Sequence, residues 1–169
     1  MDKYILGIDT SNYTTSIAVV DEQQNLLYDV RKMLTVKEGE KGLRQSEAFF
    51  QHIINIPDLL DEIPTSILKK ITSIGISSQP RPLPNSYMPV FRAGESFGKS
   101  FSHILGCNYV QFSHQEGHIE AAKWSLQKEL TGPFIAVHLS GGTTEILRVE
   151  EHHGNYQIFI VGGTSDIST

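Results

Sequence analysis

The sequence has little of what several protein classes require. It contains one cysteine, Cys107, in 169 residues, which excludes an internal disulfide. Its net charge of −5 gives no general attraction to nucleic acid, so an RNA contact would need a local basic patch or a partner protein. No apolar run approaches the roughly 20 residues that span a bilayer. These absences predict a cytoplasmic protein that makes no membrane contact.

The order of apolar and turn-forming segments predicts an α/β fold. Three strands are expected at residues 4–9, 14–20 and 26–32, each rich in apolar or β-branched side chains. A helix capped by Ser46 is expected to run to about Leu60, and its expected apolar face consists of Phe49, Ile53, Ile56 and Leu60. Pro57 is expected to kink or shorten that helix. Strands at 71–77 and 109–112 then alternate with helices, one at about 93–105 and one that runs through His118 to Leu130, which predicts a mixed central sheet.

Two strand–turn–strand segments lie 129 positions apart and resemble each other. Ser11 matches Ser140, and the pairs Thr14–Thr143, Thr15–Thr144, Ile17–Ile146 and Val20–Val149 follow. Turns of small hydroxyl and glycine residues let backbone N–H groups approach phosphate oxygens, although two ordinary hairpins can also use such turns. The repeat predicts lobe I at residues 1–132 and the opening of lobe II at 133–169. The chain is therefore expected to be the N-terminal part of a longer protein.

Two histidines, His114 and His118, form the sharpest chemical signal. Their spacing places both imidazoles on one face of a helix, within reach of one metal ion. Imidazole suits zinc and iron alike, so the spacing does not choose the metal. Two ligands do not complete a site, so a further ligand is expected beyond Thr169. The alternative is a pair of partly exposed histidines near a helix start that binds nothing.

Three motifs together resemble the TsaD family, the tRNA threonylcarbamoyltransferases formerly called O-sialoglycoprotein endopeptidases. They are the segments 5–11 (Ile-Leu-Gly-Ile-Asp-Thr-Ser), 114–118 (His-Gln-Glu-Gly-His) and 139–144 (Leu-Ser-Gly-Gly-Thr-Thr). The resemblance implies the actin/Hsp70-like (ASKHA, ribonuclease H-like) ATPase fold, which would account for the repeat. It also implies an acyltransferase that moves threonylcarbamoyl from threonylcarbamoyl-AMP to N6 of adenosine 37 in tRNA. A smaller paralogous subunit and a small ATPase are the implied partners besides tRNA.

The same resemblance suggests roles for individual residues. His114 and His118 would hold one divalent metal ion, iron or zinc. The residues that would line the site for threonylcarbamoyl-AMP or an adenine nucleotide are Asp9, Thr10, Ser11, Asn12, His138, Leu139, Ser140, Gly141, Gly142 and Thr143. No catalytic side chain is assigned.

Departures from the family pattern keep other functions open. The family's turn usually reads Thr-Ser-Cys-Asp-Glu-Thr, whereas residues 10–15 read Thr-Ser-Asn-Tyr-Thr-Thr and lack both acids. Thr143 stands where the family commonly has histidine. A non-catalytic paralogue that binds a ligand or acts as a scaffold is the alternative. A sialoglycoprotein metalloendopeptidase is disfavoured because Gln115 replaces the glutamate of the zincin motif. The 169-residue chain is expected to be inactive alone, because an incomplete cleft cannot enclose a substrate.

Overall fold

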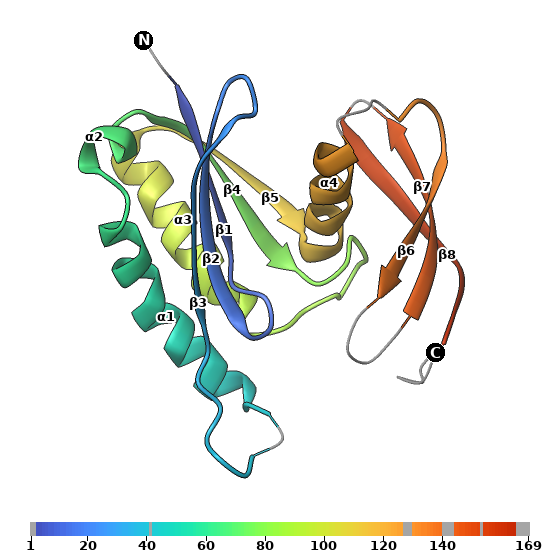
Figure 1. Cartoon of the computed structure of the whole chain (residues 1–169), viewed down its shortest axis with the longest axis horizontal. Coiled ribbons are helices and arrows are strands. Elements are labelled where there is room, and N and C mark those ends of the chain that lie inside the picture. The colour runs from blue at the N-terminus through green and yellow to red at the C-terminus, as the bar shows by residue number, and fades with distance from the viewer. Residues whose placement is uncertain (1–2, 41, 127–129, 140–143, 153, 165–169) are drawn as a thin grey trace. The chain divides into compact units, whose positions relative to one another are not determined.

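The chain forms two compact units in a computed structural model, Met1–Gln115 and Glu116–Thr169 (Figure 1). The structure describes residues 3–40, 42–126, 130–139, 144–152 and 154–164. The division between the units falls inside helix α4 (His114–Leu126). The predicted lobe boundary at 132/133 stays a prediction.

The first unit is built on a five-stranded mixed sheet in the order β3-β2-β1-β4-β5. The three N-terminal strands form an antiparallel meander, and the two later strands run parallel to β1. Their bounds are β1 (Tyr4–Asp9), β2 (Thr14–Asp21), β3 (Leu26–Met33), β4 (Ile71–Gln79) and β5 (Asn108–Ser113). The predicted α/β class with a mixed central sheet is confirmed.

Helices α1 (Gln45–Asp61) and α3 (Phe91–Leu105) cover one face of this sheet (Figure 1). A short helix that the sequence did not predict, α2 (Thr65–Leu68), lies between α1 and β4. Alternate residues of the strands face the helices, and burial of each large aliphatic side chain contributes about 1.5–3 kcal/mol. The fully or nearly fully buried core consists of Leu6, Ile8, Ile17, Val19, Ile56, Leu59, Ile63, Ile71, Ile74 and Ile76. Among the described residues, no helix combines the length and apolarity needed to cross a membrane.

Helix α1 differs from its prediction in its start and in its buried face. Arg44 is the N-cap instead of Ser46, and the Arg44 N–H donates to the Glu47 carboxylate at 3.4 Å. Pro57 lies inside the helix and does not end it. The buried residues are Ala48, His52, Asn55, Ile56 and Leu59. The buried face therefore includes two polar side chains, His52 and Asn55, and both lie within hydrogen-bond distance of the Thr15 hydroxyl on β2.

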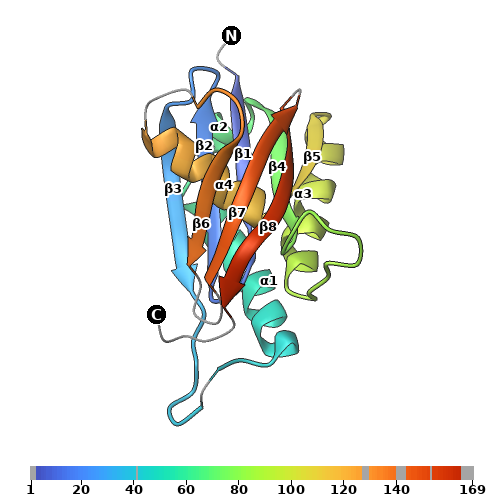
Figure 2. The same cartoon turned by 90° about the vertical axis from the view of Figure 1, so that its right-hand side faces the viewer.

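The second unit is a three-stranded antiparallel sheet in the order β6-β7-β8, together with most of α4 (Figure 2). The strands are β6 (Phe134–Leu139), β7 (Thr144–His152) and β8 (Asn155–Thr164). Its small core consists of Ile119 from α4 and Leu147 and Val149 from β7.

The two hairpins of the sequence repeat have the same strand register. Asp9 lies opposite Ser16 in the first hairpin, and His138 lies opposite Glu145 in the second, each 129 positions later. The pairs Ile5–Val20 and Phe134–Val149 correspond in the same way. The repeat is therefore a repeat of backbone geometry as well as of residue type.

Candidate functional site

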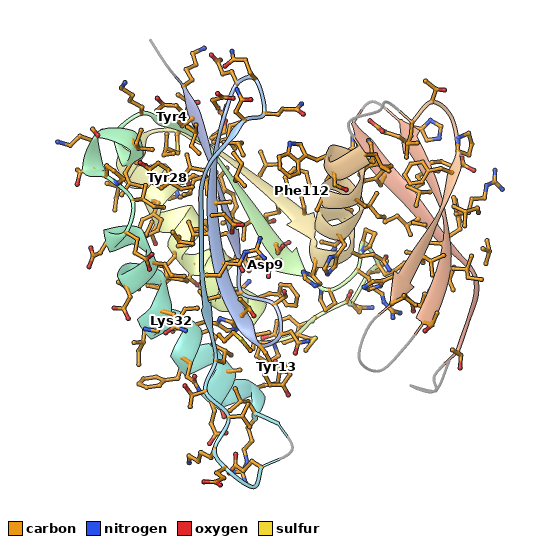
Figure 3. The ribbon with its side chains drawn as sticks, viewed as in Figure 1. Tyr4, Asp9, Tyr13, Tyr28, Lys32 and Phe112 are labelled. Atoms are coloured by element: carbon orange, nitrogen blue, oxygen red, sulfur yellow. The ribbon has the colours of Figure 1, made fainter. Side chains whose placement is uncertain are left out.

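Three parallel strands bring polar side chains to one edge of the five-stranded sheet. Asp9, which Figure 3 labels, is the last residue of β1. Ser77 lies near the end of β4, and His114 directly follows β5. Because β1, β4 and β5 are parallel neighbours, their carboxyl ends meet at this edge. In open α/β sheets such an edge is the usual place for a ligand.

Asp9 is the centre of this cluster, and both of its carboxylate oxygens accept hydrogen bonds. Oδ1 accepts from the Ser11 backbone N–H at 2.6 Å. Oδ2 accepts from the Ser77 hydroxyl at 2.6 Å and lies 2.9 Å from His114 Nδ1. Burial alone would raise the pKa of Asp9, but the hydrogen bond and charge of His114, with the bonds from Ser11 and Ser77, hold it well below its usual range. Asp9 is therefore an anion at neutral pH.

His114 is held by Asp9 on one side and by an aromatic ring on another. Its ring meets the buried ring of Phe91 edge-on, with the centroids 6.3 Å apart. With Nδ1–H donated to Asp9, a neutral imidazole carries its lone pair on Nε2. Metal-ligating histidines commonly donate their other ring nitrogen to a carboxylate in this way, so His114 fits a metal ligand.

The metal site that this arrangement fits is incomplete. His118 lies four residues after His114 in α4, on the same helix face. Among the residues that the structure describes, no group of three or more His, Cys, Asp or Glu side chains could hold a metal ion. The described part of the chain therefore offers the two predicted histidines as donors, and the third ligand stays a prediction.

The predicted residues after Asp9 lie in the β1–β2 turn and differ in their surroundings. The Thr10 side chain is buried, where its hydroxyl donates to the Val90 carbonyl at 2.8 Å and accepts from the Gly94 N–H at 3.1 Å. This pair of bonds ties the end of β1 to the start of α3. Asn12 is exposed and has a positive φ of 50°, a conformation that asparagine tolerates better than most residues. Hydrogen bonds therefore hold the first two residues of the turn, Thr10 and Ser11. The role of the turn in binding a ligand stays a prediction.

A buried polar network behind the turn was missed in the sequence. Thr15 Oγ1 lies 2.8 Å from Nδ1 of His52, and Asn55 donates to the same oxygen at 3.2 Å. Burial lowers the pKa of His52, although the Asn12 backbone and the charge of Asp9 oppose that shift. His52 Nε2 is buried and has no hydrogen-bond partner of good geometry among the described residues. The sequence did contain a signal. His52 lies four residues before the apolar Ile56, which places it on the same helix face, and Asn55 directly precedes Ile56.

The predicted residues of the second unit fall into two groups. His118 and His138 lie close together, with their ring centroids 5.4 Å apart. His138 Nδ1 is 3.8 Å from Glu145 Oε2 across the β6–β7 pair, and Leu139, the last residue of β6, is exposed. The residues of the predicted phosphate-binding turn, Ser140, Gly141, Gly142 and Thr143, lie outside the described residues.

Comparison with known proteins identifies relatives over nearly the whole chain. The model of the family described as "TsaD: tRNA N6-adenosine threonylcarbamoyltransferase" matches residues 31–168. Enzymes of that name from Thermotoga neapolitana and Streptococcus thermophilus are each 28% identical to the chain, over 97% and 98% of its length. These matches cover 48% and 47% of the relatives, so the chain spans about half their length. YeaZ from Pseudomonas aeruginosa is a structural neighbour with a TM-score of 0.56 at 14% identity, over 96% of this chain and 66% of that one. The neighbours place the chain in the actin/Hsp70-like fold that the sequence predicted.

Proposed function

The chain belongs to the TsaD family of tRNA N6-adenosine threonylcarbamoyltransferases, and from this we propose that it carries the metal-binding part of a threonylcarbamoyl transferase. The observation that supports the proposal most is the link between Asp9 and His114 at the end of the parallel strands. A carboxylate that orients a histidine, with a second histidine one helical turn later, is the arrangement of a metal-binding site. The family's reaction requires substrate positioning of the kind that such a site provides.

In the proposed reaction the N6 amine of adenosine attacks the carbonyl carbon of threonylcarbamoyl-AMP. A new N–C bond forms, the bond from that carbon to the phosphate oxygen breaks, AMP leaves, and the amine loses a proton. A divalent ion, iron or zinc, held by His114 and His118 would supply Lewis-acid polarisation. Asp9 would hold the ring of His114 in one orientation, and its bonds to Ser11 and Ser77 would fix the turn beside it.

The other participants are proposals from family membership. We propose tRNA as the acceptor, and a smaller paralogous subunit and a small ATPase as partners in the cytoplasm. The turn that contains Asp9, Thr10, Ser11 and Asn12 and the segment from His138 to Thr143 would contact the threonylcarbamoyl-adenylate. Because the chain spans about half the length of its relatives, we expect no turnover from the 169-residue chain alone.

Metal content tests the proposal directly. The purified chain is loaded with Zn²⁺ or Fe²⁺, and the bound metal is counted by elemental analysis in the wild type, His114→Ala and His118→Ala. His103→Ala is the matched control, because His103 is an exposed histidine of α3. We expect both α4 variants to lose the metal while circular dichroism stays unchanged. Retained metal in both variants would refute the metal site.

A non-catalytic paralogue is the second candidate function. The observation that favours it is the β1–β2 turn, where Tyr13 and Thr14 stand at the two positions that are usually acidic in the family. A transfer assay with tRNA, ATP, threonine, bicarbonate and the accessory proteins separates the two candidates when this chain is combined with the remainder of a relative. Modified adenosine that disappears with His114→Ala supports the transferase. A folded, metal-bound protein without product, beside an active relative, supports the paralogue.

A further inference from the structure

Asp9 was predicted to line the substrate site, and its hydrogen bonds indicate a further role within the protein. Both of its oxygens already accept bonds from the protein: Oδ1 from the Ser11 N–H, and Oδ2 from the Ser77 hydroxyl and His114. The side chain is also mostly buried, at 29% exposure. Three of the roughly four acceptor positions of this carboxylate are therefore used within the protein.

We infer that Asp9 is a positioning residue, which fixes the tautomer of His114 with its proton on Nδ1 and its lone pair on Nε2. The inference deepens the proposed function, because a metal ion is the ligand that Nε2 would receive. It concerns the ring of His114 itself, however, and so it can be measured in the protein without metal.

The geometry supports one orientation of the imidazole. His114 Nδ1 lies 2.9 Å from Asp9 Oδ2, a good hydrogen-bond length, and the carboxylate can only accept. The same carboxylate is fixed from two other directions by Ser11 and Ser77, so it cannot follow a rotated ring without losing those bonds. Phe91 packs edge-on against the ring and restricts it further.

The chain also explains why this carboxylate lies beside this histidine. Asp9 ends β1, Ser77 lies on the neighbouring β4, and His114 follows β5, the next strand across. The strand order therefore places the Asp9 carboxylate, the Ser77 hydroxyl and the His114 imidazole side by side along one edge of the sheet. A first residue of a helix that is held by two neighbouring strands has less freedom than a histidine on an isolated helix.

The tautomer is read by long-range ¹H–¹⁵N correlation of the imidazole rings in the metal-free, ¹⁵N-histidine-labelled 169-residue chain at slightly alkaline pH. His114→Gln assigns the resonance by its disappearance. We expect a protonated Nδ1 and an unprotonated Nε2 at His114. Free histidine favours the opposite tautomer, so a proton on Nε2, or averaging between the two nitrogens, would overturn the inference.

Three variants test the consequence for affinity with Zn²⁺ as the probe, measured by competition with a chromophoric chelator. Asp9→Asn keeps the shape but removes the charge, and we expect Zn²⁺ binding to weaken about 10- to 100-fold. Ser77→Ala removes one support of the carboxylate and should weaken binding less. Ser78→Ala is the matched control, because the neighbouring hydroxyl bonds to the Phe112 carbonyl and leaves Asp9 untouched.

The outcomes separate this inference from the proposed function. Equal affinity in Asp9→Asn and Ser78→Ala would show that Asp9 does not position the ligand, even if metal binds. The Nδ1–H tautomer in a wild-type chain whose metal is retained in both His114→Ala and His118→Ala would refute the metal site and leave the positioning role of Asp9 intact. If Asp9→Asn fails to fold, the tautomer in the wild-type chain still decides the question.

Discussion

The β1–β2 and β6–β7 hairpins share one register but bury opposite faces. In the first hairpin the buried residues include Ile8 and Ile17, at 3% and 0% exposure. Their counterparts 129 positions later, Val137 and Ile146, are 61% and 41% exposed. The second hairpin instead buries Leu147 and Val149 against Ile119 of α4. Hairpin geometry thus follows from the local sequence, whereas the buried face depends on which helices cover it.

The covering helices explain the difference. In the first unit α1 and α3 lie on the face that contains Leu6, Ile8 and Ile17. Among the described residues of the second unit, no helix covers the corresponding face, and Ile135, Val137 and Leu139 are exposed there. Matched substitutions in the two hairpins should therefore differ in their effects.

The largest difference is expected between Ile17→Ala and Ile146→Ala. Ile17 is fully buried, so its truncation should lower the free energy of unfolding of the first unit by about 2–5 kcal/mol. Ile146 is partly exposed, so its truncation should cost about 1 kcal/mol or less in the second unit. Hydrogen exchange followed by mass spectrometry reports on the peptides of each hairpin separately.

A control in the second unit shows whether the method can detect a loss there. Val149 is fully buried in the small core, so Val149→Ala should reduce protection in β6 and β7 and leave β1 and β2 unchanged. Equal losses from Ile17→Ala and Ile146→Ala would mean that the second hairpin is covered as well as the first.

A pair of substitutions tests the matched positions at the ends of β1 and β6, by removing a hydroxyl group at residue 10 and adding one at residue 139. Thr10→Val keeps the side-chain shape but removes the acceptor of the Gly94 N–H and one of the two donors to the Val90 carbonyl, which should cost about 1–3 kcal/mol. Leu139→Thr introduces the hydroxyl at the matched, exposed position and should change stability by about 0.5 kcal/mol or less. Denaturation followed by circular dichroism and hydrogen exchange measures both. An unchanged free energy of unfolding in Thr10→Val would show that water replaces the lost hydrogen bonds.

The sequence predicted the repeat, the order of elements and the α/β class, because strands and turns are encoded locally. It did not predict that His52 and Asn55 face the core, because helical periodicity assigns polar residues to the solvent side unless a buried partner is known. That partner, Thr15, is 37 positions from His52. Ser77 was missed for a similar reason, since its role depends on β4 lying beside β1. Contacts between distant segments are set by packing, which a linear pattern does not contain.

The buried histidine predicts a pH dependence that is confined to the first unit. Burial lowers the pKa of His52, so the unfolded state binds more protons than the folded state once the pH falls below the ordinary histidine value near 6.5. Stability contributed by neutral His52 is complete above that pH and is lost as the pH falls toward the lowered pKa. The slope should reach at most about 1.4 kcal/mol per pH unit for one proton. Asp9, whose pKa is low, stays ionised over this range.

His52→Gln is the matched variant for this measurement. Glutamine does not titrate, and its amide can still bond to Thr15. Hydrogen exchange of β1, β2 and α1 between pH 7.5 and 5 should show a weaker pH dependence of the opening free energy in the variant, after correction for intrinsic exchange rates. An unchanged slope would mean that His52 is protonated in the folded protein without cost.

The smallest effect is expected from the polar network of the second unit, which is the exposed counterpart of the buried network around His52. Lys123 of α4 donates to Glu151 at 2.7 Å and to the Tyr156 hydroxyl at 2.6 Å. The Tyr156 hydroxyl donates in turn to Glu120. Burial, with the hydrogen bond and charge of Glu120, raises the pKa of Tyr156 to about 12. The carboxylates of this network face solvent, so salt can screen them.

Tyr156→Phe and Lys123→Met, singly and combined, form a double-mutant cycle for this network. We expect a coupling energy of about 0.2–1 kcal/mol that shrinks when the salt concentration is raised, because water already stabilises the exposed partners. A spectroscopic titration of the phenol in wild type should be complete only at strongly alkaline pH, and the change assigned to Tyr156 should vanish in Tyr156→Phe. A salt-independent coupling well above this range would place the network in a dry environment. Solvent exposure would then no longer distinguish this network from the buried network around His52, and the two would differ in side-chain packing alone.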